Sequence, residues 1–261
     1  LIQYYKENGN DSSKIQKIKQ VIVNAGDVNF KRNILAELSW IYSKRHNPER
    51  NFTEKLDSNQ YLLGFKNGIY DLEKHVFRQG KPEDYVRMST GYDYCSEHSE
   101  NYPDLLKFFH DILPNEAEYE YFLLYLSHAL YGNVLELFTI LTGVGRNGKS
   151  KTIELLEMTF GQYAGSAANT FLTRPRPDAN QPDPGLLSLS KKKILITSEP
   201  EKKCKLNTGF LKFITGRDTT TLRKCHSNDM VKFSPKFLTF LICNDIPDCD
   251  DIDNAFSRRL R

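Results

Sequence analysis

The chain lacks the features that mark several classes of protein. It has only five cysteines, with no C-x-x-C pair among them, at Cys95, Cys204, Cys225, Cys243 and Cys249. An odd number of cysteines without ligand spacing argues against a disulfide framework or a structural zinc site, and it indicates a reducing intracellular compartment. No apolar stretch approaches the length of a membrane span, and no basic-then-apolar leader opens the chain. We therefore expect a soluble intracellular protein that makes no contact with a membrane.

The chain also has little net charge. Its 261 residues hold 36 Lys and Arg against 33 Asp and Glu, which gives a formal net charge of +3. This mild excess neither requires nor excludes a nucleic-acid partner, so the placement of charge has to decide. The length favours two structural units. Because the chain begins at Leu1 and stops within a charged segment at Arg261, we expect a piece of a larger polypeptide.

The first half of the chain has mostly helical periodicity. Apolar residues at three- and four-residue spacing predict two amphipathic helices between Lys14 and Ile41, and more helix between Tyr102 and Tyr131. Asn67-Gly68 lies between apolar runs, which predicts a short β-hairpin over residues 62–77. We assign residues 1–132 to a mostly helical N-terminal module with this hairpin, and residues 133–261 to a second domain.

The second domain contains a pattern that binds phosphate in many proteins. The pattern G-x-x-x-x-G-K-[ST] is matched by Gly143-Val144-Gly145-Arg146-Asn147-Gly148-Lys149-Ser150. A β-prone run at 137–142 precedes it and a helical pattern follows, so its backbone N–H groups and the helix N-terminus would converge on an anion. Lys149 would reach the β- and γ-phosphates, and Ser150 would hold Mg²⁺. The alternative is a glycine-rich turn with a chance lysine.

Two further strands end in polar residues. The apolar run 194–197 predicts a buried strand followed by Ser198 and Glu199, and the run 237–243 predicts another followed by Asn244. In open α/β sheets ligands collect at the carboxyl ends of the strands. Glu199 would there polarise the attacking water or touch Mg²⁺, with Glu201 as a second candidate, and Asn244 would bind the water and a γ-phosphate oxygen. Taken singly, the two residues also fit a surface loop acid and a turn.

The remaining segments supply a loop, a hairpin and a group of arginines. The proline-rich stretch 174–185 predicts a surface loop, and strands are expected at 219–223 and 230–233 around a turn. Arg258, Arg259 and Arg261 follow an acidic stretch. An arginine aimed at a γ-phosphate accelerates its transfer strongly, from the same subunit or from a neighbour. Salt-bridged surface arginines are the alternative.

These motifs together resemble superfamily 3 helicases of the D5/P4-type primase-helicases of large DNA viruses, phages and plasmids. The resemblance covers roughly half of the chain and lies in five blocks, namely 143–150, 197–201, 211–218, 242–247 and 256–261. Upstream, residues 61–72 resemble the D5 N-terminal module of that family. The fold implied is α/β, a P-loop core of the AAA+ type with a central parallel sheet, behind a helical collar module.

The resemblance implies a role for each matching residue. Gly143 to Ser150 would be the Walker A loop for ATP, Glu199 the Walker B carboxylate and Asn244 the sensor asparagine, with an arginine finger at Arg258 or Arg259. Many Walker B motifs end in two adjacent acids, whereas here Ser198 precedes Glu199 and Pro200 follows it. It therefore stays open whether one glutamate both orders Mg²⁺ and activates water.

The resemblance also implies partners. It predicts a ring, as a hexamer, with ATP between subunits, DNA in the central pore and translocation from 3′ to 5′. Lys224, His226 and Lys232 lie beside the turn of the expected hairpin, where they would grip the DNA backbone; a solvated hairpin tip is the alternative. A primase domain is expected upstream on the full-length chain, and the host cytoplasm is the expected location.

Two other functions compete with an ATP-driven helicase. One is a P-loop ATPase that acts in nucleic-acid packaging or assembly without unwinding. The other is a small-molecule kinase, but the chain lacks a recognisable acceptor site or lid and has the sensor and finger series instead.

Overall fold

The structure is a computed structural model that describes residues 12–45, 52–96, 100–132, 135–178, 181–201, 204–223, 225 and 230–261. The chain divides into two compact units, Leu1–Lys55 and Leu56–Arg261. The sequence placed its domain boundary near residue 132 instead. The compact units divide earlier because the elements between residues 62 and 131 bury their apolar side chains in the same core as the second half of the chain. As a division into modules of separate origin, the boundary at 132 stays a prediction.

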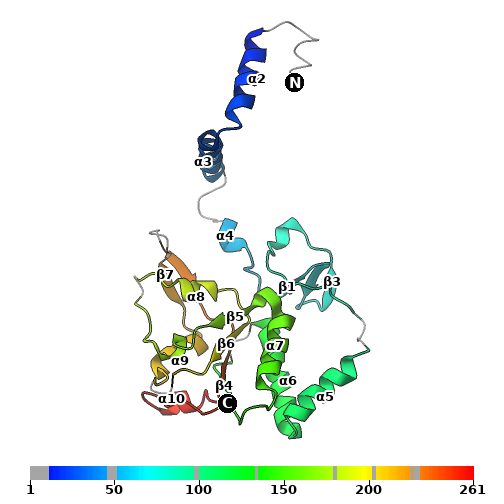
Figure 1. Cartoon of the computed structure of the whole chain (residues 1–261), viewed down its shortest axis with the longest axis vertical. Helices are drawn as coiled ribbons and strands as arrows, with labels where there is room; N and C mark the ends of the chain where they lie inside the picture. The colour runs from blue at the N-terminus through cyan, green and yellow to red at the C-terminus, as the bar shows by residue number, and fades with distance from the viewer. Residues whose placement is uncertain are drawn as a thin grey trace. The chain divides into compact units, whose positions relative to one another are not determined.

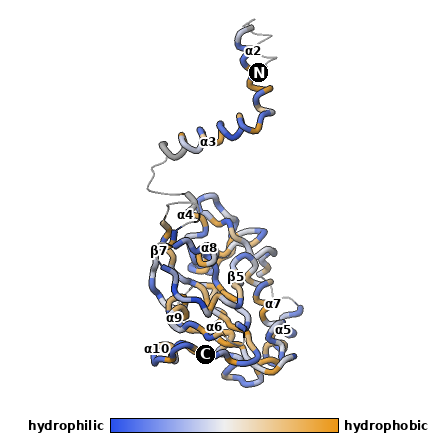
Figure 2. The backbone as a smooth tube through the Cα atoms, turned by 60° about the vertical axis from the view of Figure 1, so that its left-hand side comes forward, coloured by the Kyte–Doolittle hydropathy of each residue, from blue (hydrophilic) through white to orange (hydrophobic). Residues whose placement is uncertain are grey.

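The first unit is helical, as the spacing of apolar residues predicted. Its helices are α2 (Ser12–Asn24), α3 (Val28–Arg45) and the short α4 (Phe52–Lys55) (Figure 1). The Asp27 carboxylate accepts a hydrogen bond from the Phe30 amide (2.8 Å) and so satisfies a free donor in the first turn of α3. Hydrophobic and hydrophilic residues alternate along both long helices (Figure 2). Several large apolar side chains are exposed on them, including Ile22, Leu35 and Leu38.

The second unit begins with a small antiparallel sheet. Its strands are β1 (Leu62–Phe65), β2 (Gly68–Asp71) and β3 (Val76–Arg78). Phe65 pairs with Gly68, which leaves Lys66-Asn67 as the two-residue turn, and the predicted hairpin is confirmed. The Asn67 side chain accepts a hydrogen bond from the Tyr94 amide (2.8 Å) and donates one to the Tyr94 carbonyl (3.0 Å). These two bonds hold the 92–95 segment against the sheet.

A four-stranded parallel sheet forms the centre of the second unit. Its order is β4-β9-β6-β5, with β4 (Phe138–Leu141), β5 (Ala164–Ala167), β6 (Ile194–Ser198) and β9 (Leu238–Ile242). The apolar runs predicted for three of these strands are confirmed, and the α/β fold class is confirmed with them. The backbone of Arg259–Arg261 adds to the free edge of β4, where Phe138 and Leu260 form a parallel bridge.

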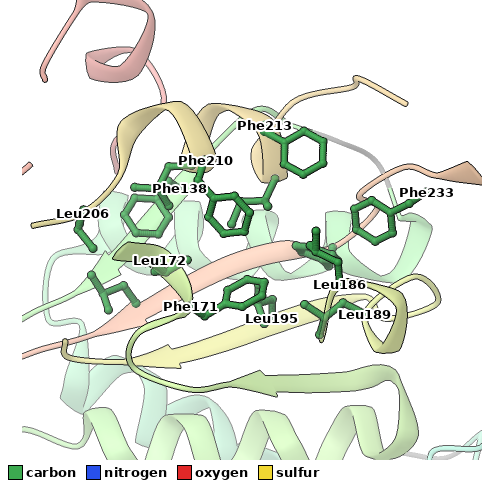
Figure 3. Close-up of a cluster of buried hydrophobic side chains, with 14 of the residues drawn as sticks. Phe138, Phe171, Leu172, Leu186, Leu189, Leu195, Leu206, Phe210, Phe213 and Phe233 are labelled. Atoms are coloured by element: carbon green, nitrogen blue, oxygen red, sulfur yellow. The ribbon is translucent and has the colours of Figure 1, made fainter. Parts of the chain in front are cut away.

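Helices cover both faces of this sheet. Along β6 the side chains alternate, so that Ile194 and Ile196 join one core and Leu195 joins the other. The first core is covered by α5 (Tyr102–Ile112), α6 (Glu116–Tyr131) and α7 (Lys149–Phe160). The second core is covered by α8 (Pro184–Ser188) and α9 (Thr208–Thr215), with α10 (Asn254–Ser257) beside α9. Figure 3 shows Phe210 and Phe213 of α9 gathered with Phe138, Leu195 and their neighbours in the second core.

Short elements complete the unit. They are the 3₁₀ turns η1 (Pro82–Asp84), η2 (Gly161–Tyr163) and η3 (Phe171–Thr173), and the antiparallel pair β7 (Thr220–Arg223) and β8 (Met230–Phe233). The pair confirms the expected strands. In the proline-rich loop, Arg174 forms an ion pair with Asp183 (2.8 Å) and lies over the ring of Phe171 (4.4 Å). The ion pair joins the start of the loop to its end. Asp183 also caps α8, because its carboxylate accepts a hydrogen bond from the Leu186 amide. Among the described residues, no helix is long and apolar enough to cross a membrane.

Candidate nucleotide site

The octapeptide of residues 143–150 forms a tight loop between β4 and α7. Three of its residues have positive φ angles, Gly143 at 145°, Arg146 at 68° and Gly148 at 85°. A Cβ atom on Gly143 would collide with the Asn147 amide, and one on Gly148 would lie 2.7 Å from the Ile112 side chain of α5. The loop conformation therefore depends on these two glycines. It carries the chain from the end of a buried strand directly into a helix N-terminus, as the pattern predicted.

The backbone of this loop offers donors to an anion. Over residues 144–148, all described, no backbone N–H donates a hydrogen bond to another backbone group. Helix α7 begins at Lys149, so its positive dipole end faces the same place. Unpaired N–H groups that converge at a helix N-terminus are the feature that binds phosphate in such loops. The geometry fits a phosphate chain.

The ammonium group of Lys149 lies over this loop. Its Nζ donates hydrogen bonds to the Gly143 carbonyl, to the Asn147 carboxamide oxygen (3.1 Å) and to the Asn244 carboxamide oxygen (3.5 Å). All three acceptors are neutral. An anionic phosphate oxygen would form a stronger, charge-assisted bond with the same group, so the contacts shown are ones that a phosphate can replace.

Glu199 and Asn244 meet beside Lys149, which is what the strand ends predicted. In the sheet Ser198 of β6 pairs with Ile242 of β9, so the residues that follow both strands leave the same edge together. The Glu199 carboxylate accepts a hydrogen bond from the backbone amide of Asn244 (3.0 Å). The structure thus brings Lys149, Glu199 and Asn244 together, although they lie as much as 95 residues apart.

Thr142 is a residue of the site that the sequence analysis did not single out. Its hydroxyl donates to the Asn244 carbonyl (3.1 Å) and ties the end of β4 to the end of β9. The available signal was its position between a buried strand and the first glycine of the loop. Cys243 is buried just below, and burial raises the pKa of its thiol, which favours the neutral thiol.

The residues present suit Mg²⁺ better than a softer metal. Ser150, at the start of α7, and Glu199 offer a hydroxyl and a carboxylate, the oxygen donors that Mg²⁺ prefers while it keeps several of its waters. Within the described part of the chain, no group of three or more His, Cys, Asp and Glu side chains stands at metal-binding distance. A magnesium ion that shares its ligands with a phosphate chain fits the donors.

The candidate arginines lie beside the amino end of β4, whereas the P-loop follows its carboxyl end. The Phe138 amide, at the start of β4, donates to the Arg259 carbonyl (2.6 Å). Gly143 is the fifth residue after Phe138, roughly 16 Å away at the rise of a β-strand. The structure thus does not bring Arg258 or Arg259 into the site formed by Lys149, Glu199 and Asn244 of the same chain.

The expected DNA-binding hairpin is described only in part. Lys232 is exposed on β8, opposite Thr221 of β7. Lys224 and His226 lie outside the described residues. The contribution of these three residues to DNA binding stays a prediction.

Comparison with known proteins identifies relatives of the whole chain. Residues 3–114 match the family described as D5 N terminal like. "Putative helicase L207/L206" of Acanthamoeba polyphaga mimivirus is 37% identical over 260 residues, which is 98% of this chain and 26% of that protein. "Putative helicase 184R" of Invertebrate iridescent virus 6 is 33% identical over 219 residues, 81% of this chain and 23% of that protein. "Putative primase C962R" of African swine fever virus is 26% identical over 230 residues, 86% of this chain and 23% of that protein.

A solved structure of the NrS-1 C-terminal region is also similar, with a TM-score of 0.48 and 18% identity, over 61% of this chain and 37% of that one. The chain spans about a quarter of the length of its viral relatives. Its N-terminal segment matches the D5 model, and its similarity to the mimivirus protein extends over 98% of the chain. The chain therefore belongs to the D5-type family of helicase and primase proteins of large DNA viruses.

Proposed function

We propose that the chain is the ATPase module of a DNA helicase, which hydrolyses ATP between the subunits of a ring. One observation carries the proposal: Lys149, Glu199 and Asn244 converge at the carboxyl ends of the parallel strands, and the arginines lie at the amino end of β4. Each copy then holds the phosphate-binding half of a site and, on its other side, the arginine half of another.

The phosphate-binding half accounts for ATP as the ligand. The N–H groups of residues 144–148 cradle the phosphates, and the Lys149 ammonium leaves the Gly143 carbonyl to neutralise the β- and γ-phosphates. Ser150 and Glu199 would hold Mg²⁺, which would neutralise charge on the phosphate oxygens. Glu199 also orients the attacking water and accepts a proton from it. The side-chain carboxamide of Asn244 binds that water and a γ-phosphate oxygen.

The arginine half requires a second copy. A guanidinium that stabilises charge on the γ-phosphate must come within hydrogen-bond distance of it, and roughly 16 Å of strand separates the two ends of β4 within one chain. Neighbours in a ring bring these opposite ends together, which is a heterologous contact that closes after a fixed number of subunits. We propose six.

The family supplies the rest of the proposal. Relatives named as helicases and primases favour DNA as the substrate that the ring translocates along. Translocation from 3′ to 5′, a primase domain on the same polypeptide and action at a replication site in the host cytoplasm are carried by the resemblance alone. Lys224, His226 and Lys232 would contact the DNA backbone in the pore.

Unwinding of a forked duplex tests the proposal. The protein is expected to displace the labelled strand with ATP and Mg²⁺, and DNA is expected to stimulate its ATP turnover. Lys149→Ala should lower turnover by at least about 100-fold because it removes charge stabilisation on the phosphates. Lys151→Ala is the matched control, since Lys151 pairs with Glu154 on the exposed side of α7.

Two results would decide against the helicase. ATP turnover that DNA does not stimulate, without strand displacement, would favour the packaging or assembly ATPase. Full turnover by Lys149→Ala would remove the nucleotide site itself.

A further inference from the structure

Glu136 gathers two arginines at the amino end of β4. It lies two residues before the strand, in a left-handed backbone conformation with φ of 57°. One carboxylate oxygen accepts a hydrogen bond from Arg259 Nη2 (3.0 Å), and the other lies 3.4 Å from Arg217 Nε. Arg217 follows α9, and Arg259 follows α10. Glu136 thus joins three segments at the amino end of β4, the end opposite to the P-loop.

Arg259 is held in place by several bonds. Besides Glu136, its guanidinium donates to the Ala255 carbonyl of α10 (2.9 Å), and its side chain is only 19% exposed. Its own carbonyl accepts from the Phe138 amide. To reach a phosphate of another molecule, Arg259 would have to abandon both side-chain contacts and leave the Glu136 carboxylate with Arg217 as its remaining arginine partner. Its bonds suit a structural anchor better than a mobile finger.

Arg258 has the opposite character. It caps the C-terminal end of α10, where its backbone amide donates to the Asn254 carbonyl, and it is exposed to solvent. The fixed neighbour Arg259 determines the direction in which Arg258 leaves the helix, because the two residues are consecutive. The Glu136–Arg259 pair therefore sets where the exposed guanidinium of Arg258 can reach.

We propose that Glu136 is a positioning residue: through Arg259 it fixes the end of α10 so that Arg258 is presented to the γ-phosphate bound by a second copy. The carboxylate also offsets the repulsion between Arg259 and Arg217, which would otherwise drive the guanidinium groups apart. This inference rests on the proposed function and adds to it the identity of the finger and the residue that orients it.

Steady-state ATP turnover by the protein tests the proposal first. Glu136→Gln keeps the size of the side chain and removes its charge, so Arg259 loses its ionic partner. We expect kcat to fall by about 100-fold, the effect of misplacing a catalytic group by roughly 1 Å, while KM changes less than about twofold because the P-loop is untouched. Glu116→Gln is the matched control: it changes an exposed carboxylate that hydrogen-bonds His110 (2.9 Å), between α6 and α5.

The arginines should respond in a defined order. Arg258→Ala should lower kcat by about 1,000-fold, the low end of the contribution known for such arginines. Arg259→Ala should resemble Glu136→Gln, and adding Glu136→Gln to Arg258→Ala should lower kcat no further. A larger loss in Arg259→Ala than in Arg258→Ala would overturn the assignment, because Arg259 would then be the finger.

Mixing variants separates positioning from a folding defect. In a mixture of Glu136→Gln with Glu199→Gln, some interfaces join an intact P-loop of the first to an intact arginine half of the second, so turnover should partly return. A subunit misfolded by Glu136→Gln would also lose its own P-loop and would give no recovery at any ratio, which would overturn the proposal. Wild-type protein without any ATP turnover would overturn the proposed function, whereas normal turnover by Glu136→Gln would overturn only this inference.

Discussion

Lys193 offers a quantitative test of how the second unit is held together. Its side chain is buried, with 5% of the residue exposed, at the point where the chain enters β6. Its Nζ donates hydrogen bonds to the Gln60 carbonyl (2.8 Å), just before β1, and to the Leu130 carbonyl near the end of α6. Burial, with a smaller contribution from Lys236, lowers the pKa of Lys193 to about 8 from its ordinary value of 10.5.

This lower pKa makes the stability of the unit depend on pH. The unfolded chain binds the Lys193 proton more tightly than the folded one, so the free energy of unfolding should rise as pH increases from about 8 to 10.5. The full lowering corresponds to about 3 kcal/mol, and this is an upper bound because the two carbonyls also favour the ammonium form. A neutral amine still has two N–H groups for two carbonyls, so deprotonation removes the cost of burying a charge without breaking either bond.

Urea unfolding between pH 7 and 10.5 measures the effect. The wild type is compared with Lys193→Met, since the difference between them cancels the titration of all other groups. We expect that difference to shift in favour of the wild type by about 1 to 3 kcal/mol across the range. The same comparison with Lys107→Met, at an exposed lysine of α5, should show no comparable shift. A difference for Lys193→Met that is constant with pH would refute the reasoning.

Two other substitutions test the loop and the hairpin. Gly148→Ala should lower stability by about 1–2 kcal/mol and weaken ATP binding, because Gly148 has a φ of 85° and a Cβ there would meet Ile112. Gly145→Ala, which meets nothing within 4 Å, is its control, and equal ATP affinity for the two variants in a fluorescence titration would contradict the strain argument. Lys232→Ala should weaken DNA binding for all sequences and reduce the slope of log affinity against log salt by about 1. A slope unchanged from wild type would show that Lys232 does not touch the DNA backbone.

The elements that build the site could be predicted because each has its own local signal. Gly143, Gly148 and Lys149 occur at fixed offsets between a strand and a helix, and backbone conformation at these positions follows from residue type. Glu199 and Asn244 could be placed together because parallel strands end at one edge. The hydrogen bond between Glu199 and Asn244, and the one from Thr142 to Asn244, could not be predicted. Both depend on how far each strand extends beyond the sheet.

Strand β5 shows where local signals fail. Its residues, Ala164–Ala167, contain no large apolar side chain, so neither alternation nor a buried apolar run marks it. It is a strand because the backbone groups of β6 pair with it, from Ala164 with Ile194 to Ala167 with Thr197. The division at Lys55 has a similar origin, since the long helices before residue 132 have a local pattern, whereas the elements that they pack against do not follow from it.

The sequence by itself determined the glycine-containing loop at 143–150, the long helices and most strands of this protein, because periodicity and glycine placement act over a few neighbouring residues. Only the tertiary structure decided which groups Glu136 and Lys193 contact. Glu136 contacts Arg259, which is 123 residues away in the sequence, and Lys193 contacts Gln60, which is 133 residues away. No local sequence pattern encodes these contacts. They arise because burial of the two apolar cores brings these segments together, and a charge in such a place needs the partner that the fold provides.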